Sequence, residues 1–132
     1  MKVTFLLFAA ITLCACGGGL SDEVVDLGQG FMLYHEGTTS NVIVHDSYAS
    51  GQAFIPCNVA RYSYNDDYIV ALQEPQRECF FDTSCYEYKS GYAVCYYWIV
   101  DKKDKRFYGP LSEQEFNWQF SKLKLPATLR KM

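Results

Sequence analysis

The first 16 residues most constrain which part of this chain can fold, and in which compartment. Lys2, the only positive charge of the segment, is followed by an apolar run at residues 3–13. A run of about ten apolar residues is too short to span a bilayer, which needs roughly 20 residues of helix. The pattern is typical of a cleaved export signal. We therefore expect residues 1–15 to be removed and the remaining chain to fold outside the cytosol.

The end of this segment resembles the lipobox of bacterial lipoproteins. That motif needs a small residue before the cleaved bond and a cysteine after it to receive diacylglycerol, and Ala15 and Cys16 meet both demands. Lipidation at Cys14 would place Leu13 at the small-residue position, so we expect the lipid on Cys16. Each buried methylene contributes about 0.8 kcal/mol, so several acyl chains anchor a protein stably. The alternative is an ordinary secretory signal that ends in cysteines.

The lipobox resemblance implies a location in the cell envelope. Gly17, rather than aspartate, follows the expected anchor, which resembles the pattern sorted to the outer membrane, facing the periplasm, in a Gram-negative host. In a Gram-positive host the anchor would hold the protein on the outer face of the cytoplasmic membrane. We expect residues 16–27, with glycines at 17–19, to be a flexible tether, and residues 28–132 to be a single globular domain.

Size and charge narrow the class of partner. Loss of the leader leaves 117 of the 132 residues, enough for one domain with a modest core. It also leaves 11 of the 12 basic side chains against 15 acidic ones, a net charge of −4. An acidic balance argues against nucleic acid, which needs a basic face. It also gives no attraction to anionic headgroups, so contact with the membrane would depend on the lipid anchor.

Four cysteines follow the expected anchor, at Cys57, Cys79, Cys85 and Cys95. An even number in an exported domain indicates two disulfides, each worth roughly 2 to 4 kcal/mol. A hairpin around residues 89–91 would place Cys85 opposite Cys95, and a hairpin around residues 65–67 would bring Cys57 near the segment leading to Cys79. We predict these two pairs. No Cys-x-x-Cys pair is present, so we predict no metal site, and no cofactor motif is visible.

Aromatic residues make up 17% of the chain, and they favour strands. Alternation of apolar and polar residues predicts strands at residues 31–34, 41–45, 59–64, 68–72, 92–100 and 106–108. One face of the strand at 92–100 would hold Tyr92, Val94, Tyr96, Trp98 and Val100. Residues 21–26 are expected to be a weakly structured lead-in, and Gly109-Pro110 is expected to stop the last strand.

A helix is predicted near the C-terminus. Ser112 followed by Glu115 is a capping-box pattern, and Pro126 marks the end of the helix. Its apolar face would hold Phe116, Phe120 and Leu123. Trp118 lies off this face and is expected to pack on a neighbouring strand or loop. The predicted fold is α+β: a mainly antiparallel β-sheet of about five to seven strands, crossed by one C-terminal amphipathic helix and stapled by disulfides.

Catalytic candidates are few. His45 is followed by Asp46 and Ser47, but a triad depends on groups that converge in space rather than in sequence. We interpret His35-Glu36 as a solvated pair. Asp66 and Asp67 could serve as paired carboxylates or calcium ligands, yet turn geometry alone selects Asn and Asp at a hairpin tip. Of the arginines, Arg61, Arg77 and Arg106 are scattered, so no anion clamp is predicted.

A second resemblance extends over roughly residues 54–123. It rests on Ile55-Pro56, Val59, Tyr62, Tyr64-Asn65, Tyr68-Ile69-Val70 and Gln73, on residues 96–102, and on Tyr108-Gly109-Pro110-Leu111-Ser112 with Glu115-Phe116. Together they resemble a domain-of-unknown-function family of small bacterial lipoproteins. The resemblance implies a fold and carries no catalytic residue. Residues 74–91 depart from the short linker expected there.

The function expected from these features is that of a membrane-anchored envelope lipoprotein that binds another protein of the envelope. One alternative is an immunity lipoprotein that neutralises a toxin directed to the periplasm, since an acidic surface steers association with basic partners. A second is a hydrolase of envelope polymers, but the sequence shows no specific set of nucleophile and base, so we expect no enzyme. A ligand carrier that stacks rings on a tyrosine-rich sheet face is a further alternative.

Overall fold

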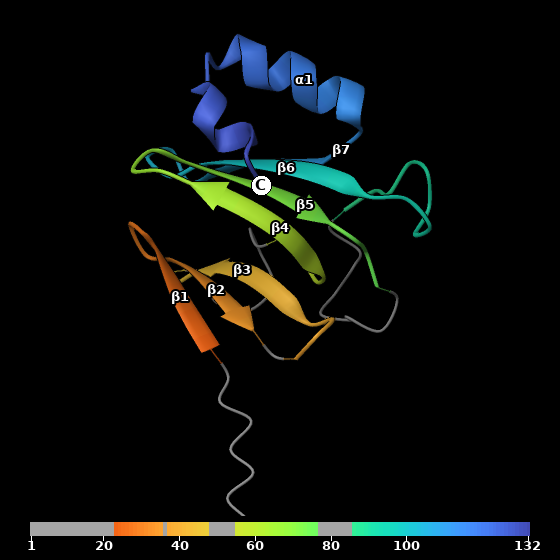
Figure 1. Cartoon of the computed structure of the whole chain (residues 1–132), viewed down its shortest axis with the longest axis horizontal. Coiled ribbons are helices and arrows are strands. Elements are labelled where there is room, and N and C mark those ends of the chain that lie inside the picture. The colour runs from red at the N-terminus through yellow and green to blue at the C-terminus, as the bar shows by residue number, and fades with distance from the viewer. Residues whose placement is uncertain (1–22, 36, 48–54, 77–85) are drawn as a thin grey trace, which may run out of the picture.

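The computed structural model describes residues 23–35, 37–47, 55–76 and 86–132. The elements in chain order are β1 (Glu23–Gly28), β2 (Phe31–His35), β3 (Asn41–His45), β4 (Val59–Tyr64), β5 (Tyr68–Gln73), β6 (Tyr96–Asp101), β7 (Arg106–Leu111), the helix α1 (Glu113–Lys122) and the short 3₁₀ helix η2 (Ala127–Arg130). The strands form two antiparallel sheets, β1-β2-β3 and β4-β5-β6-β7. The four-stranded sheet lies between the three-stranded sheet and the helices (Figure 1).

One apolar core fills the space between the two sheets. Alternation along each strand places one set of side chains on the inner face, where they are shielded from water. Trp98 on β6 is its largest member and is fully buried. The other buried members are Leu27, Phe31, Leu33, Ile43, Ile55, Val59, Ile69, Ala71 and Val100. The three-stranded sheet therefore covers one face of the four-stranded sheet.

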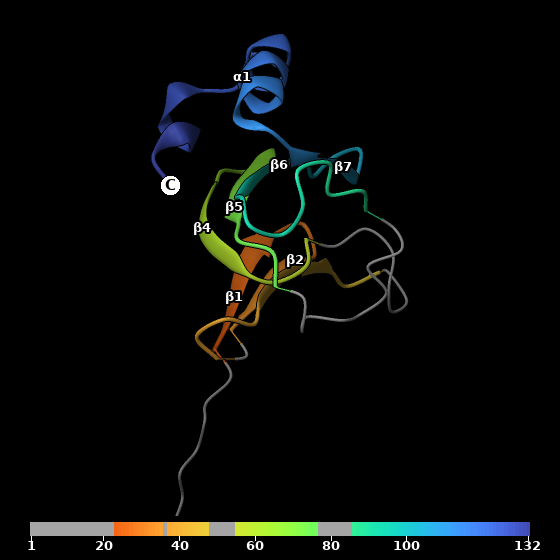
Figure 2. The same cartoon turned by 90° about the vertical axis from the view of Figure 1, so that its right-hand side faces the viewer.

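The helices α1 and η2 lie on the other face of the four-stranded sheet (Figure 2), and a second apolar core lies under them. It contains Val70, Ile99, Phe116, Phe120, Leu125 and Leu129. The predicted capping box is confirmed: the backbone N–H of Glu115 donates to Ser112 Oγ at 3.2 Å, and that of Ser112 donates to Glu115 Oε2 at 2.8 Å. The cap satisfies backbone donors that a helix N-terminus leaves open, so α1 begins at a defined residue.

The prediction of one sheet is wrong, because the seven strands of the described residues belong to two sheets. The expected lead-in at residues 21–26 is also wrong from Glu23 onward, where β1 begins. This strand pairs with β2, and Val25 and Leu27 pack into or against the core between the sheets. Charged residues at the solvent-facing positions of an edge strand hid this alternation from the sequence analysis.

The predicted strand at 92–100 begins only at Tyr96, and the hairpin expected around residues 89–91 is a turn without paired strands. Tyr92 and Val94 are 37% and 43% exposed. The backbone N–H of Gly91 donates to the Tyr88 carbonyl, which closes the turn, and the Tyr96 hydroxyl donates to the Gly91 carbonyl. The buried tyrosine hydroxyl thus stabilises the turn in place of a strand ladder.

Gly109-Pro110 does not stop the last strand as predicted, since β7 continues to Leu111. This strand is the edge of its sheet, where proline is tolerated because the missing N–H faces no partner strand. The register shifts between Tyr97 and Ile99 of β6, opposite this pair of residues. A β-carbon on Gly109 would lie 2.4 Å from two ring atoms of Trp98, so only glycine fits there.

The disulfide prediction is wrong for one pair. Cys95 is an exposed free thiol, so it does not pair with Cys85. The reason is the missing hairpin, which would have placed the two residues opposite each other. Cys57 is buried and disulfide-bonded. Cys79 and Cys85 lie outside the described residues, as does Cys16, so the pairing of Cys57 with Cys79 stays a prediction and the described residues do not show a two-disulfide staple.

Candidate functional site

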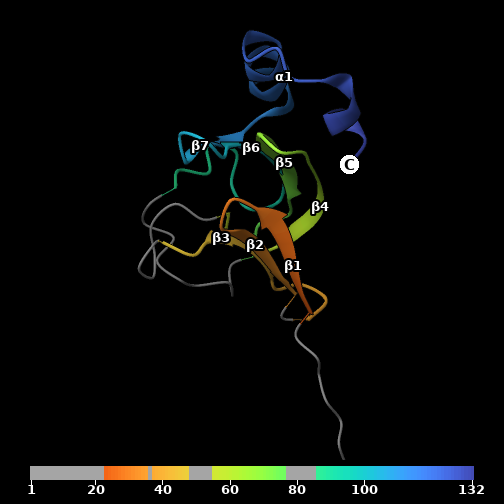
Figure 3. The ribbon, with the colours of Figure 1, turned by 90° about the vertical axis from the view of Figure 1, so that its left-hand side faces the viewer.

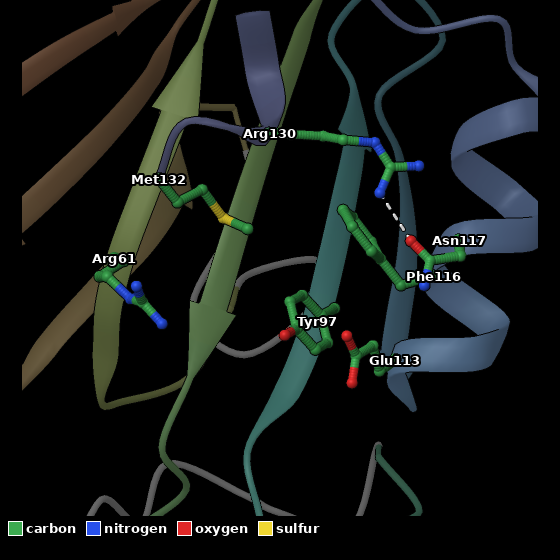
Figure 4. A pocket seen from close by; sticks show the side chains of 7 residues that line it. All are labelled: Arg61, Tyr97, Glu113, Phe116, Asn117, Arg130 and Met132. Atoms are coloured by element: carbon green, nitrogen blue, oxygen red, sulfur yellow. Dashed lines mark hydrogen bonds between the residues drawn. The ribbon is translucent and has the colours of Figure 1, made fainter. Parts of the chain in front are cut away.

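The helices leave part of the outer face of the four-stranded sheet open. Helix α1 contacts β6 and β7, whereas η2 contacts β4 and β5. A hollow of about 230 Å³, called here the arginine hollow, lies between the helix and the C-terminal segment (Figure 4). Its lining consists of Arg61, Tyr97, Glu113, Phe116, Asn117, Arg130 and Met132. A concave site with an apolar floor and a few polar groups is the usual form of a ligand site.

Arg130 is held in position on one side of the arginine hollow. Its Nη1 donates to Asn117 Oδ1 at 2.6 Å, and its guanidinium carbon lies 4.1 Å from the ring centroid of Phe120 and 5.8 Å from that of Phe116. Stacking on two rings and a hydrogen bond restrict a side chain that is otherwise flexible. The guanidinium is therefore pre-oriented, with most of its donors unused by the described residues.

The opposite side of the arginine hollow carries Arg61, which projects from β4 toward the ring of Tyr97 (Figure 4). The Tyr97 ring stacks on Phe116, with 4.7 Å between the centroids. Glu113, in the first turn of α1, is the one carboxylate side chain among the lining residues. Arg61 was predicted to be isolated, and it shares this hollow with Arg130. The pair is not visible in the sequence, because 69 positions separate the two residues.

A second hollow, of about 470 Å³, opens at the end where the two sheets meet. Lys102 lines it and is only 2% exposed. Its ammonium donates to the backbone carbonyl oxygens of Leu27 and Asn65. Leu27 lies on β1 of the three-stranded sheet, and Asn65 lies in the turn between β4 and β5 of the four-stranded sheet. Burial lowers the pKa of Lys102, against an opposing attraction from three nearby carboxylates, those of Asp66, Asp26 and Asp67. Lys102 lies in the turn between β6 and β7, and its ammonium joins the two sheets.

His45 does not form the triad that its neighbours could suggest. Its Nε2 lies 3.0 Å from the Gln29 carbonyl oxygen, to which it donates, because Nδ1 accepts from the Ser47 backbone N–H at 3.1 Å. Ser47 Oγ and Asp46 Oδ1 lie 2.7 and 3.4 Å from this same Nδ1. A triad needs its serine and carboxylate on opposite ring nitrogens. The imidazole, only 5% exposed, therefore holds a turn, and the hydrolase hypothesis gains no support from it.

The remaining candidates also have structural roles. His35 Nδ1 lies 2.8 Å from Asn41 Oδ1, across the β2-β3 pair, and Glu36 lies outside the described residues. Asn65 Oδ1 accepts from the backbone N–H groups of Asp67 and Tyr68, at 3.0 and 2.8 Å, as in an Asx turn. In the part of the chain that the structure describes, no group of three His, Cys, Asp or Glu residues could hold a metal ion.

The comparison with protein families finds a match. A family described as "Protein of unknown function (DUF3997)" matches residues 28–130. The chain belongs to this family. No curated protein and no solved structure matches the chain.

The DUF3997 match extends further than the resemblance deduced from residues 54–123. It begins at the turn before β2 and ends with η2, so it includes both sheets apart from most of β1. Of the residues that line the arginine hollow, only Met132 lies beyond the match. Lys102 of the second hollow is included. Most residues that line the two hollows therefore lie within the part of the chain that the family model matches.

The outer face of α1 presents an aromatic side chain that the sequence analysis placed elsewhere. Trp118 was expected to pack on a strand or loop, but it is 62% exposed. Its ring lies 4.5 Å from Lys122 Nζ, one turn further along the same helix. The apolar face of α1 packs on the sheet, so the opposite face of the helix points to solvent, and Trp118 lies on that outer face. In the described part of the chain, no helix has the length and apolar character to cross a membrane.

Proposed function

We propose that this member of the DUF3997 family is a membrane-anchored envelope lipoprotein that binds another envelope protein through its helical layer. The anchor is Cys16, which follows Ala15 at the end of an apolar leader. A lipid anchor fixes one end of a molecule at the membrane surface. What the anchored molecule can reach then depends on where the tether joins the fold.

The observation that carries the proposal is the position of β1. The strand begins at Glu23, and its start lies on the side of the molecule away from α1, with the four-stranded sheet between the two (Figures 1 and 3). A tether attached at Glu23 leaves the helical layer pointing away from the membrane. That layer carries the arginine hollow and the exposed Trp118. Tryptophan and arginine are the residue types most enriched at the energetic centres of protein interfaces.

Anchoring is tested by metabolic labelling with a palmitate analogue. The wild-type chain is expected to take up the label, and Cys16→Ala is expected to lose it. Cys14→Ala is the matched control, because it removes a neighbouring thiol and leaves the expected lipidation site. Label on both variants, or on neither the wild type nor the control, contradicts the anchor.

Binding is tested in cells with a photo-crosslinking amino acid placed at position 118 or, as a control, at position 24. Val24 is 47% exposed and lies on β1, at the tethered side of the molecule. A protein that cross-links from position 118 and not from position 24, and is identified by mass spectrometry, supports the proposal. Equal products from both positions, or none from either, contradict it. A toxin as the cross-linked protein would favour the immunity alternative.

A further inference from the structure

The side chains that line the arginine hollow carry more positive than negative charge. Arg61 and Arg130 line it together with one carboxylate side chain, that of Glu113. The ion pairs among the described residues join Lys89 to Glu115 and His45 to Asp46, and neither arginine takes part in one. Two guanidinium groups therefore lie on opposite sides of one small hollow (Figure 4), and no ion pair among the described residues engages either, in a chain whose net charge is −3.

The guanidinium geometry selects the kind of anion. A guanidinium presents five donors in a planar fork that matches a carboxylate. One donor of Arg130 is used by Asn117, and this bond fixes the orientation of the fork. A pre-oriented group loses less entropy on binding than a free side chain. Arg130 is therefore the pre-formed half of the site, and the exposed Arg61 is the half that closes on a ligand.

The shape of the hollow selects the size of the ligand. At about 230 Å³ it is smaller than the roughly 300 to 1,000 Å³ of sites for drug-sized molecules. Phe116 and Met132 give it apolar surface, and the Tyr97 hydroxyl adds a donor on the side of the ring that faces Arg61 (Figure 4). A short aliphatic stem that ends in a carboxylate fits this combination of apolar floor and basic rim.

We propose that the arginine hollow binds the side-chain carboxylate of a glutamate or aspartate residue on the partner protein. This inference rests on the proposed function, because it names the group by which the helical layer engages its partner. Arg61 and Arg130 bind the carboxylate, and the ring of Phe116 contacts the stem. Glu113 opposes binding by repulsion, which restricts the site to ligands that engage both arginines.

The test is an NMR titration of the ¹⁵N-labelled protein, purified from cells that express the full chain. The probe is the capped tripeptide Ac-Ala-Glu-Ala-NH₂, with Ac-Ala-Gln-Ala-NH₂ as the neutral control. The chain has arginines at positions 61, 77, 106 and 130 only, so their Nε–Hε signals are readily assigned. We expect saturable shifts at Arg61 and Arg130 with the glutamate peptide alone, with a millimolar Kd that weakens as salt is added.

Three variants make the inference specific. Arg61→Gln is expected to weaken binding about three- to fivefold, and Glu113→Gln is expected to tighten it by a similar factor. Lys103→Gln, a change at an exposed lysine in the β6-β7 turn outside the hollow, is expected to change nothing. Loss of structure is not expected to weaken binding in the first variant and to tighten it in the second. Equal effects from all three would overturn the inference.

Other outcomes are equally decisive. Equal shifts with the glutamine peptide overturn recognition of a carboxylate. Binding of Ac-Ala-Ala with a free C-terminal carboxylate, without binding of the glutamate peptide, overturns the assignment to a side chain. An absence of shifts, combined with a specific cross-link from position 118, overturns the arginine hollow as the contact and leaves the binding function standing.

Discussion

Among the glycines of the described residues, Gly109 leaves the least room for a β-carbon, and its substitution tests the packing of the fold directly. Gly109→Ala places a β-carbon 2.4 Å from two ring atoms of Trp98, where ordinary contacts are about 1 Å longer. Trp98 is fully buried, and its indole N–H donates to Gln73 Oε1 at 2.7 Å. Neighbouring side chains therefore pack around the ring, and the hydrogen bond holds its edge in place, so the ring has little freedom to move away from a new β-carbon.

The magnitude follows from the competing terms. Overpacking a well-filled core costs about 1 to 3 kcal/mol, and a ring that cannot move places this site at the upper end. Alanine loses less chain entropy than glycine on folding, by about 0.5 to 1 kcal/mol, but the φ of 158° at this position is strained for alanine and opposes this gain. We expect Gly109→Ala to lower the free energy of unfolding by about 2 kcal/mol. In a domain of about 100 residues this corresponds to a fall in Tm of roughly 10 °C.

The assay is a double-mutant cycle measured by urea unfolding. Trp98→Leu removes the ring and lowers stability by itself, by up to about 3 to 5 kcal/mol, because it leaves a cavity. In that background, Gly109→Ala is expected to cost much less, since its methyl group enters the vacated space and only the strain of the backbone at a φ of 158° remains. Gly91→Ala, in a turn with open space around the residue, is the control and should cost the same in both backgrounds. Additive effects of Gly109→Ala and Trp98→Leu would refute the packing argument.

Three further outcomes are expected. Gln73→Leu should lower the free energy of unfolding by about 2 to 4 kcal/mol, because the indole N–H of Trp98 and the hydroxyl of Tyr88 lose a buried partner; unchanged urea midpoints would contradict this. Ser112→Ala should cost about 1 kcal/mol in thermal unfolding, while a cost near zero would mean that the cap is not needed. Hydrogen bonds from the Ser112 backbone lower the pKa of Glu115 below its ordinary 4.5, so its contribution to stability is present above pH 4.5 and lost as the pH falls through the folded pKa. Glu115→Gln should therefore reduce stability at pH 7 and have little effect at pH 2, whereas equal effects at both pH values would contradict the capping role.

The features that were predicted correctly depend on local sequence. The helix after Ser112 follows from a capping box and an apolar period, both of which lie within about ten residues. The strands at 41–45 and 59–64 have the predicted bounds, since alternation and flanking turn residues are also local. The prediction failed where a distant contact decides the outcome, as at Gly109, whose place in an edge strand depends on the position of β7 in the sheet.

The candidate site was less accessible to the sequence analysis than the fold. Arg61 and Arg130 belong to an exposed strand and a short 3₁₀ helix, and neither carries a motif. Their common hollow exists because η2 packs over β4 and β5 while α1 packs over β6 and β7. An exposed Trp118 is equally invisible in sequence, because a tryptophan just off an apolar face can be packed or presented to solvent. Surface sites of this kind depend on how whole layers are placed.

The division into two sheets has a physical cause that apolar patterning does not contain. Alternation shows which side of each strand is buried. It does not show whether the strands form one continuous sheet or two stacked sheets, because the same side is buried in both cases. Here the choice is made by polar contacts at the ends of the two layers. The buried ammonium of Lys102 bonds to carbonyl oxygens of Leu27 and Asn65 at one end. The side-chain amide of Asn41 bonds to the Val59 carbonyl at the other, at 3.4 Å. Lys102 is buried and Asn41 is half-buried, so leaving these groups unpaired costs free energy, and the stacked arrangement is the one in which they are satisfied.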